Sequence, residues 1–217
     1  TSPERLEYLE YLLKNTPSYL NSAFLLSAGT ESTEAALKIM RMNAKKNKKK
    51  LPGIISFEGN WHGRTMGAQF MCGNDPQKEW IGFEDPNMHR LPFPYPWKKE
   101  AQIDPYNFFL KSIKNLKKQK KLNLKKDICG IIMESFQGWG SIFYPKEFVK
   151  SVFDFAKKNN ILLCFDEMQA GFGRTGKLFG YMHYGVKPDL VCAGKGTSSS
   201  LPLSLLLGKK EYMNIEN

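Results

Sequence analysis

The segment "ILLCFDEMQAGFGRTGKLFGYMHYGVKPDLVCAGKG", residues 161–196, contains two short apolar runs, and a charged residue follows each of them. The runs ILLCF and DLVCA have the continuous apolar character of strands in a sheet that is covered on both faces. Asp166 follows the first run directly, and Lys195 stands between two glycines just after the second. Ligands of such sheets bind at the carboxyl ends of the strands. We therefore expect Asp166 and Lys195 at a ligand site.

The same kinds of pattern extend through the rest of the chain. Apolar runs predict strands, and amphipathic spacing predicts helices. Residues 73–105 hold six prolines among aromatic residues, which predicts irregular structure. Together these patterns predict an α/β fold in which a mostly parallel sheet is flanked by helices. The predicted strands are 23–28, 53–57, 128–134, 161–167, 189–193 and 203–208, and the predicted helices are 3–14, 31–46 and 145–159.

Length and composition are those of a globular protein. The chain has 217 residues, of which 41% are hydrophobic, enough for one sizeable α/β domain or two small ones. No apolar run approaches the roughly 18–20 residues of a membrane helix, and the N-terminal stretch does not resemble a signal peptide. Four widely spaced cysteines suggest neither a disulfide framework nor a metal site. We expect a soluble, cytoplasmic protein without metal or membrane partner.

The net charge of +11 raises the question of a nucleic-acid partner. Two short runs carry this charge: "KKNKKK" at residues 45–50 holds five lysines, and residues 111–126 hold eight lysines and no acid. The first run is typical of a helix end, and the second of a solvated helix or loop. No aromatic residues are interleaved with the lysines to stack on bases. We therefore predict no nucleic-acid partner, with polyanion binding as the alternative.

Three groups together indicate a particular cofactor chemistry. Gly29 and Thr30 directly precede a predicted helix, whose first N–H groups can hold a phosphate, although a capped glycine turn is the alternative. Asp166 is expected to be partly buried and to need a cationic partner. Lys195 is uncrowded, and its amine can trap a carbonyl when deprotonated. A lysine imine, an acid that keeps a pyridinium protonated and an anion-binding helix start are what pyridoxal phosphate requires of a protein.

The chain resembles the class III aminotransferases, of the ornithine and 4-aminobutyrate type, within the fold-type I pyridoxal phosphate superfamily. The resemblance covers most of the chain, and the interval from Asp-Glu-x-Gln to the lysine is its most specific element. It implies the cofactor-binding large domain over residues 1–217, expected to be a fragment that lacks an N-terminal segment and a C-terminal small domain. The matching segments, in order, are "SAGTESTEAALKIMR", "EGNWHGRTMGA", "IIMESFQGWG", "CFDEMQAGFGRTGKLFGYMHYGVKPDLVCAGKG" and "LPLSLLLGKKEYM".

The resemblance also implies a role for each matching residue. Lys195 would form the internal aldimine and move the substrate proton, while Asp166 would pair with the pyridinium nitrogen. Gln169 would hydrogen-bond near the phenolic oxygen, and Gly29 with Thr30 would hold the phosphate. Trp61 would stack on the pyridine ring, and Glu134 would lie close to cofactor and substrate. Taken alone, Trp61 is more typical of a core aromatic residue, and the neighbouring His62 is expected to have a structural role.

The function implied is an aminotransferase that moves an amino group from an amino acid or ω-amine to a 2-oxo acid by a ping-pong mechanism, as a homodimer at full length. The family commonly has proline where this chain has Ser135, and often an acid on the substrate side where it has Trp139. A racemase, an aminomutase or a decarboxylating transaminase would share the same cofactor residues. An inactive cofactor-binding fragment is the alternative that is not an enzyme.

A P-loop ATPase is the remaining alternative, because "GFGRTGKL" matches the spacing of a phosphate-binding loop. Leu178 stands where a serine or threonine should bind Mg²⁺, and no strand runs directly into the motif. Both features argue against that function.

Overall fold

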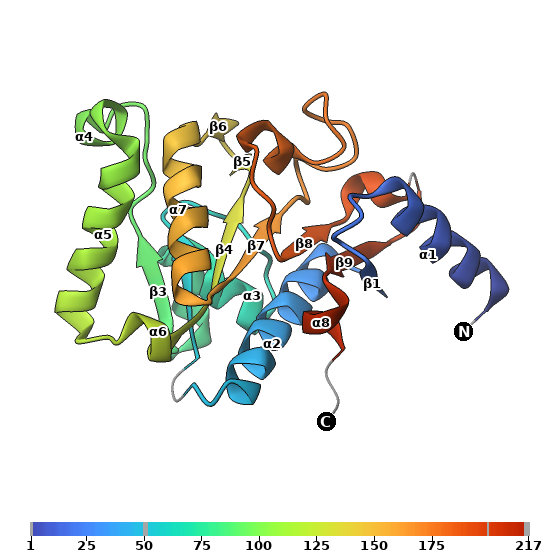
Figure 1. The fold of residues 1–217 in the computed structure, drawn as a ribbon, viewed down its shortest axis with the longest axis horizontal. Coiled ribbons are helices and arrows are strands. Elements are labelled where there is room, and N and C mark those ends of the chain that lie inside the picture. The colour runs from blue at the N-terminus through green and yellow to red at the C-terminus, as the bar shows by residue number, and fades with distance from the viewer. Residues whose placement is uncertain (1, 50–51, 199, 215–217) are drawn as a thin grey trace.

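The chain folds into a seven-stranded sheet with helices on both faces (Figure 1). The computed structural model describes residues 2–49, 52–198 and 200–214, so Lys50 of the first basic run lies outside the described residues. The strand order is β1-β9-β8-β7-β4-β2-β3. These strands are β1 (Ser22–Leu26), β2 (Gly53–Phe57), β3 (Met88–Leu91), β4 (Ile128–Glu134), β7 (Leu162–Asp166), β8 (Leu190–Ala193) and β9 (Ser204–Gly208).

Eight α-helices, three 3₁₀-helices and a small hairpin complete the described structure. The α-helices are α1 (Pro3–Asn15), α2 (Gly29–Lys46), α3 (Met66–Met71), α4 (Lys99–Ile103), α5 (Pro105–Lys120), α6 (Leu124–Asp127), α7 (Lys146–Asn159) and α8 (Lys210–Met213). The hairpin is formed by β5 (Phe136–Gln137) and β6 (Ile142–Phe143), and the 3₁₀-helices are η1 (Pro76–Ile81), η2 (Gly180–Tyr184) and η3 (Lys195–Thr197).

The sheet is mostly parallel, as the sequence predicts. β3, β2, β4, β7 and β8 run parallel to one another, whereas β9 lies antiparallel between β8 and β1. The carboxyl ends of the five parallel strands therefore meet at one edge of the sheet. This edge is where ligands of open α/β sheets bind.

Each face of the sheet has its own apolar core. One core packs α5 and α7 against the sheet, with Phe109 and Phe148 at its centre. The other packs α2 against the opposite face through Ile39 and Met40. Because both faces are buried, the central strands carry apolar side chains in both directions. All four cysteines are free and buried, and Cys129, Cys164 and Cys192 belong to the second core.

Most predicted elements are confirmed, with ends displaced by a few residues. The prediction for residues 73–105 is wrong in part, because the segment contains η1, β3 and α4. β3 is only four residues long, Pro86 and Pro92 flank it, and it pairs with a single neighbour. Local sequence therefore carries little strand signal, and pairing with β2 decides the conformation. The second basic run forms the C-terminal part of α5 and the first three residues of α6.

No helix within residues 2–49, 52–198 and 200–214 has both the length and the apolar character that crossing a membrane requires.

Substitution of Phe148 by alanine tests the core between α7 and the sheet. Phe148 is 1% exposed, and its ring lies 5.6 Å from those of Phe57 and Phe109. We expect Phe148→Ala to lower the free energy of unfolding by about 3–5 kcal/mol, because it removes buried area and leaves a cavity. Urea denaturation measures the loss. Phe83→Ala, at a ring that is 59% exposed, should cost less than about 1 kcal/mol; equal losses would contradict this account.

Candidate active site

The predicted site residues gather at the carboxyl edge of the parallel strands. Glu134 and Asp166 are the last residues of β4 and β7, and they are direct partners across the two strands. Asp166 is in turn paired with Cys192 of β8, and Lys195 follows three residues later. The backbone N–H of Trp61 donates to Glu134 Oε2 at 3.0 Å. The topology thus joins residues from four distant parts of the chain.

A close approach brings the start of α2 to the lysine loop. The sulfur of Met168 lies against both Gly29 and Gly194, so that a Cβ would stand 2.9 Å from it at Gly29 and 2.5 Å at Gly194. Any side chain at either glycine would displace Met168. The glycines therefore allow the helix start and the residue before Lys195 to pack against the same methionine.

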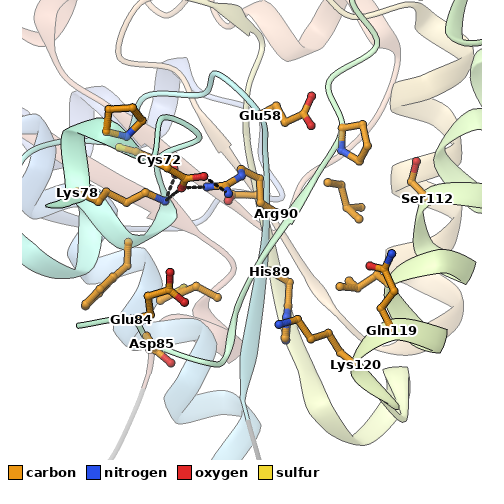
Figure 2. Close-up of a pocket in the computed structure, with 18 of the residues that line it drawn as sticks. Glu58, Cys72, Lys78, Glu84, Asp85, His89, Arg90, Ser112, Gln119 and Lys120 are labelled. Atoms are coloured by element: carbon orange, nitrogen blue, oxygen red, sulfur yellow. Dashed lines mark hydrogen bonds and ion pairs between the residues drawn. The ribbon is translucent and has the colours of Figure 1, made fainter. Parts of the chain in front are cut away.

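A large cavity beside the edge strand β3 holds none of the predicted site residues. It measures about 1010 Å³, and η1, β3 and α5 provide most of its walls (Figure 2). Two of its cationic side chains, Lys78 and Arg90, are paired with Asp75. The residues that the sequence indicates as site residues lie at the sheet edge and not in this cavity.

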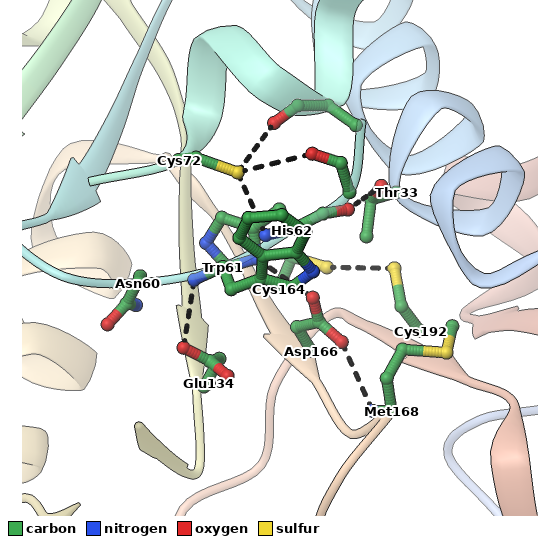
Figure 3. A network of polar contacts seen from close by, with 12 residues as sticks. Thr33, Asn60, Trp61, His62, Cys72, Glu134, Cys164, Asp166, Met168 and Cys192 are labelled. Atoms are coloured by element: carbon green, nitrogen blue, oxygen red, sulfur yellow. Dashed lines mark hydrogen bonds and ion pairs between the residues drawn. The ribbon is translucent and has the colours of Figure 1, made fainter. Parts of the chain in front are cut away.

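Asp166 is buried and paired with a histidine. The side chain is 3% exposed, and Oδ2 lies 2.8 Å from Nδ1 of His62 (Figure 3). Oδ1 accepts the backbone N–H of Met168 at 3.1 Å. Both carboxylate oxygens thus have a partner, which a buried carboxylate requires. Sequence reasoning assigned His62 no part in the site, and only its position directly after Trp61 could have suggested one.

The backbone of His62 is itself held in place. Thr33 Oγ1 donates to the carbonyl oxygen of His62 at 2.7 Å, and the N–H of His62 donates to Cys72 Sγ at 3.1 Å. The imidazole Nε2 is buried and has no partner among the described residues. His62 therefore offers a fixed imidazole to Asp166 and is a positioning residue for it.

Glu134 can keep a proton near neutral pH. The side chain is 4% exposed and accepts the N–H groups of Trp61 and Gly138 through different oxygens. Burial raises the pKa of Glu134 to about 7, while the charge of His62 opposes and that of Asp166 reinforces the rise. The site therefore places a carboxyl group that titrates around neutrality next to the buried Asp166.

The start of α2 has free hydrogen-bond donors. The carboxylate of Glu31 turns back and accepts the N–H groups of Ser27 and Ala28 at 2.8 and 2.9 Å. Within the described part of the chain, no acceptor meets the N–H groups of Gly29 and Thr30. Two free donors at the positive end of an 18-residue helix can bind an anion. The Thr30 hydroxyl lies 2.7 Å from that of Thr65, which joins this helix start to the Trp61 loop.

Lys195 is exposed, as its flanking glycines predict. It is the first residue of η3, directly beyond β8 and Gly194. Its amine has no hydrogen bond or ion pair within residues 2–49, 52–198 and 200–214. The amine is therefore free to bind a ligand at the sheet edge.

Trp61 and Gln169 line a second cavity next to Glu134. This cavity measures about 710 Å³ and also includes Tyr95 and Trp139. Trp61 is 37% exposed and is not a core residue, and the guanidinium carbon of Arg64 lies 5.0 Å from its ring centroid. An accessible aromatic face thus lies beside the carboxyl group of Glu134.

The side chain of Ser135 takes part in a buried hydrogen-bond network. Its hydroxyl donates to the buried carboxylate of Glu167, which also accepts the N–H groups of Gly180 and Tyr181 at 2.7 and 2.8 Å. These contacts hold the turn-rich segment 171–179 at the end of β4.

The same segment contains the motif GFGRTGKL and leads directly into the 3₁₀-helix η2. A P-loop needs an α-helix directly after its glycine motif, and none follows here, which argues against a P-loop.

The arrangement fits pyridoxal phosphate. The free N–H groups of Gly29 and Thr30 suit a phosphate, and the histidine-paired carboxylate of Asp166 suits a protonated ring nitrogen. The free amine of Lys195 suits an aldehyde. Trp61 adds an accessible indole face for a flat ring. Each part of the cofactor thus has a complementary group in the chain.

Comparisons with known proteins identify one family. The model of the family "Aminotransferase class-III" matches residues 1–217. A 4-aminobutyrate aminotransferase of Mycobacterium leprae is 32% identical over 97% of this chain and 47% of that protein. An acetylornithine aminotransferase of Streptococcus mutans is 32% identical over 88% of this chain and 44% of that protein. The chain spans about half the length of the curated relatives it matches.

Solved structures agree with these sequence matches. A thermostable (S)-enantioselective omega-transaminase from Thermomicrobium roseum superimposes with a TM-score of 0.87 and 31% identity, over 98% of this chain and 48% of that one. An amine transaminase from an uncultivated Pseudomonas species, in its PLP-bound form, has a TM-score of 0.86 and 27% identity over 98% of this chain and 49% of its own. The fold is thus that of about half of a fold-type I transaminase.

Glu134→Gln tests the carboxyl group at the sheet edge. The folded-state pKa of about 7 lies above the ordinary value of 4.5, so the folded chain keeps a proton that the unfolded chain has released. The free energy of unfolding should therefore fall as the pH rises from 4.5 to 7, by up to about 3 kcal/mol from this group alone. Glutamine cannot ionise and should remove that contribution.

Urea denaturation of wild type and variant across this pH range measures the effect. The free energy of wild type minus that of the variant should decrease as the pH rises. Glu79→Gln, at an exposed position, should give a pH profile parallel to wild type. A constant difference between wild type and Glu134→Gln would show that Glu134 does not titrate in this range.

Proposed function

This chain belongs to the class-III aminotransferase family, and we propose that it forms the cofactor-binding large domain of a pyridoxal phosphate-dependent aminotransferase. The whole protein would move an amino group from an amino acid or ω-amine to a 2-oxo acid by a ping-pong mechanism. In this proposal residues 1–217 lack the N-terminal segment and the C-terminal small domain of the enzyme. The observation that carries it is the buried pair of His62 and Asp166, which stands beside Glu134 at the sheet edge that leads to Lys195.

Asp166 would hold a proton at the ring nitrogen of the cofactor. When bound, pyridoxal phosphate withdraws electrons from the carbon that carries the substrate nitrogen, and a protonated ring does so best. Asp166 suits this role because its carboxylate is buried, which strengthens its attraction for a cation. His62 would keep the carboxylate in one orientation, since its own backbone is held from both sides.

Lys195 would bind the cofactor aldehyde and move the proton of the substrate. Both tasks need an amine that can approach and withdraw, and this is consistent with its exposure and with the small neighbours Gly194 and Gly196. The N–H groups of Gly29 and Thr30 would hold the phosphate, while Trp61 would cover one face of the ring. Gln169 would donate to the phenolic oxygen, and Glu134 would hold or release a proton beside the substrate.

We also propose that the whole protein is a cytoplasmic homodimer. Trp61, Lys195 and the start of α2 are all exposed or partly exposed in this chain. Turnover requires that water be excluded from the reacting atoms. The openness of the site in this chain is consistent with a cover supplied by further chain or by a second subunit.

Borohydride reduction tests Lys195. Incubation with pyridoxal phosphate, reduction and peptide mapping should find Lys195 as the preferentially modified lysine, because its amine is free and lies next to groups that suit the phosphate and the ring. Lys195→Ala should abolish this labelled peptide. Lys177→Ala, at another exposed lysine, should leave labelling of Lys195 unchanged. The experiment is run on the full-length natural protein that contains this chain. Uniform labelling of its surface lysines would refute the assignment.

Two substitutions at Asp166 separate charge from packing. Asp166→Ala should lower the rate of turnover by about a hundredfold or more, equivalent to ~3 kcal/mol, while Lys195 can still be labelled. Asp166→Asn keeps the shape and the contact to Met168 but carries no charge, so it should be nearly as slow. Steady-state kinetics with a matched donor and acceptor measure both. Recovery of turnover in Asp166→Asn would mean that the carboxylate acts only through packing.

A further inference from the structure

Two aromatic residues that line the cavity beside Glu134, Tyr95 and Trp139, have no role in the proposed function. We propose that the cavity binds the non-reacting end of the amino donor and that this end is an aryl or similarly apolar group that packs on the exposed indole of Trp139. The inference rests on the proposed function, because it takes the reacting end of the donor to lie at Lys195. Trp61, Glu134 and Gln169 line the same cavity, so it is continuous with the site described above.

Trp139 is exposed and yet held in place. Its side chain is 67% exposed, although burial of an indole in the core is favourable. The ring Nε1–H donates to the carbonyl oxygen of Gly59 at 2.9 Å, which fixes the indole over the loop that leads to Trp61. The preceding residue, Gly138, donates its N–H to Glu134 at 3.1 Å. An aromatic face is thus presented to solvent in a defined position next to the site.

Tyr95 is the second fixed aromatic side chain. Its ring stacks on that of Trp97, with centroids 4.6 Å apart and planes inclined by 10°. Its hydroxyl lies 3.3 Å from Nε2 of Gln137, which also donates to the carbonyl oxygen of Glu58. The stacking and the hydrogen bond restrict the ring. Because both aromatic residues are ordered before a ligand arrives, little side-chain freedom is lost on binding.

The charges around the cavity favour an apolar ligand end. Glu58 and Asp75 lie at its rim, but Glu58 is paired with Lys98, and Asp75 with Arg90 and Lys78. Neither carboxylate is free to hold a distal ammonium group. Of the described residues that line the cavity, none is a lysine or an arginine, and the guanidinium of the neighbouring Arg64 lies against the Trp61 ring, so no lining cation meets a distal carboxylate. The ring of Tyr95 is already in contact with Trp97 and Lys98, so the exposed indole of Trp139 remains as the unengaged aromatic surface.

Two donors that differ only in the non-reacting group test this inference. 1-Phenylethylamine and butan-2-amine carry the same amine and methyl groups at the reacting carbon. In the longest natural protein that contains this chain, loaded with pyridoxal phosphate, kcat/KM should be at least tenfold higher for the phenyl donor. Trp139→Ala should reduce that ratio about tenfold, because only the phenyl donor loses a contact. 4-Aminobutyrate, with its distal carboxylate, should be a poorer donor than 1-phenylethylamine.

Trp80→Ala is the matched control. Trp80 is also exposed, at 61%, and its Nε1–H donates one hydrogen bond, to Gln69 Oε1 at 3.0 Å, but it does not line the cavity. Its removal should change the donor ratio less than twofold. An equal fall in Trp80→Ala and Trp139→Ala, or an unchanged ratio in Trp139→Ala, would overturn the inference. Higher kcat/KM for 4-aminobutyrate than for 1-phenylethylamine in the wild type would overturn it as well.

A binding measurement gives a readout that does not need turnover. 1-Phenylethanol has the shape of the phenyl donor but no amine, and calorimetry should show about tenfold weaker binding to Trp139→Ala than to wild type. Equal binding to both proteins would overturn the inference. Failure of the proposed function would instead appear as loss of specific borohydride labelling at Lys195. Intact labelling together with an unchanged donor ratio would reject the aromatic subsite alone.

Discussion

The contact between His62 and Asp166 is the constraint on which the rest of the site depends. Asp166 ends a strand that is buried on both faces, and an unpaired carboxylate in such a place is costly. The loop after β2 crosses the sheet edge, and its His62 is the partner of this carboxylate. Thr33 in α2 and Cys72 after α3 hold the histidine backbone there. One contact between two side chains thus couples three layers of the fold to the position of Trp61.

The second constraint is the space around Met168. Its sulfur lies against Gly29 and Gly194, and neither position can accept a Cβ without moving it. The start of α2 and the residue before Lys195 are thereby packed against a single side chain. The separation between the anion site and the lysine therefore depends on two positions that carry no side chain.

Polar contacts behind the sheet edge support the segments that form the substrate side. Glu167 is buried beside Asp166, and burial raises its pKa, but it receives hydrogen bonds from Ser135 and from two backbone N–H groups at the start of η2. These contacts tie the long turn after β7 to the end of β4. The neighbouring residues up to Trp139 are held by Glu134 and Gly59. Rigid support of this kind favours selection among ligands by shape.

Local patterns in the sequence predict the α/β class, most strands and helices, and the candidate residues Gly29, Asp166 and Lys195. Apolar periodicity and short motifs are local, so they can be recognised without coordinates. The folded chain was needed to show that β3 pairs with β2, that His62 meets Asp166 and that burial raises the pKa of Glu134 to about 7. Strand pairing, desolvation and contacts between segments a hundred residues apart arise when the chain closes on itself, and no local pattern encodes them.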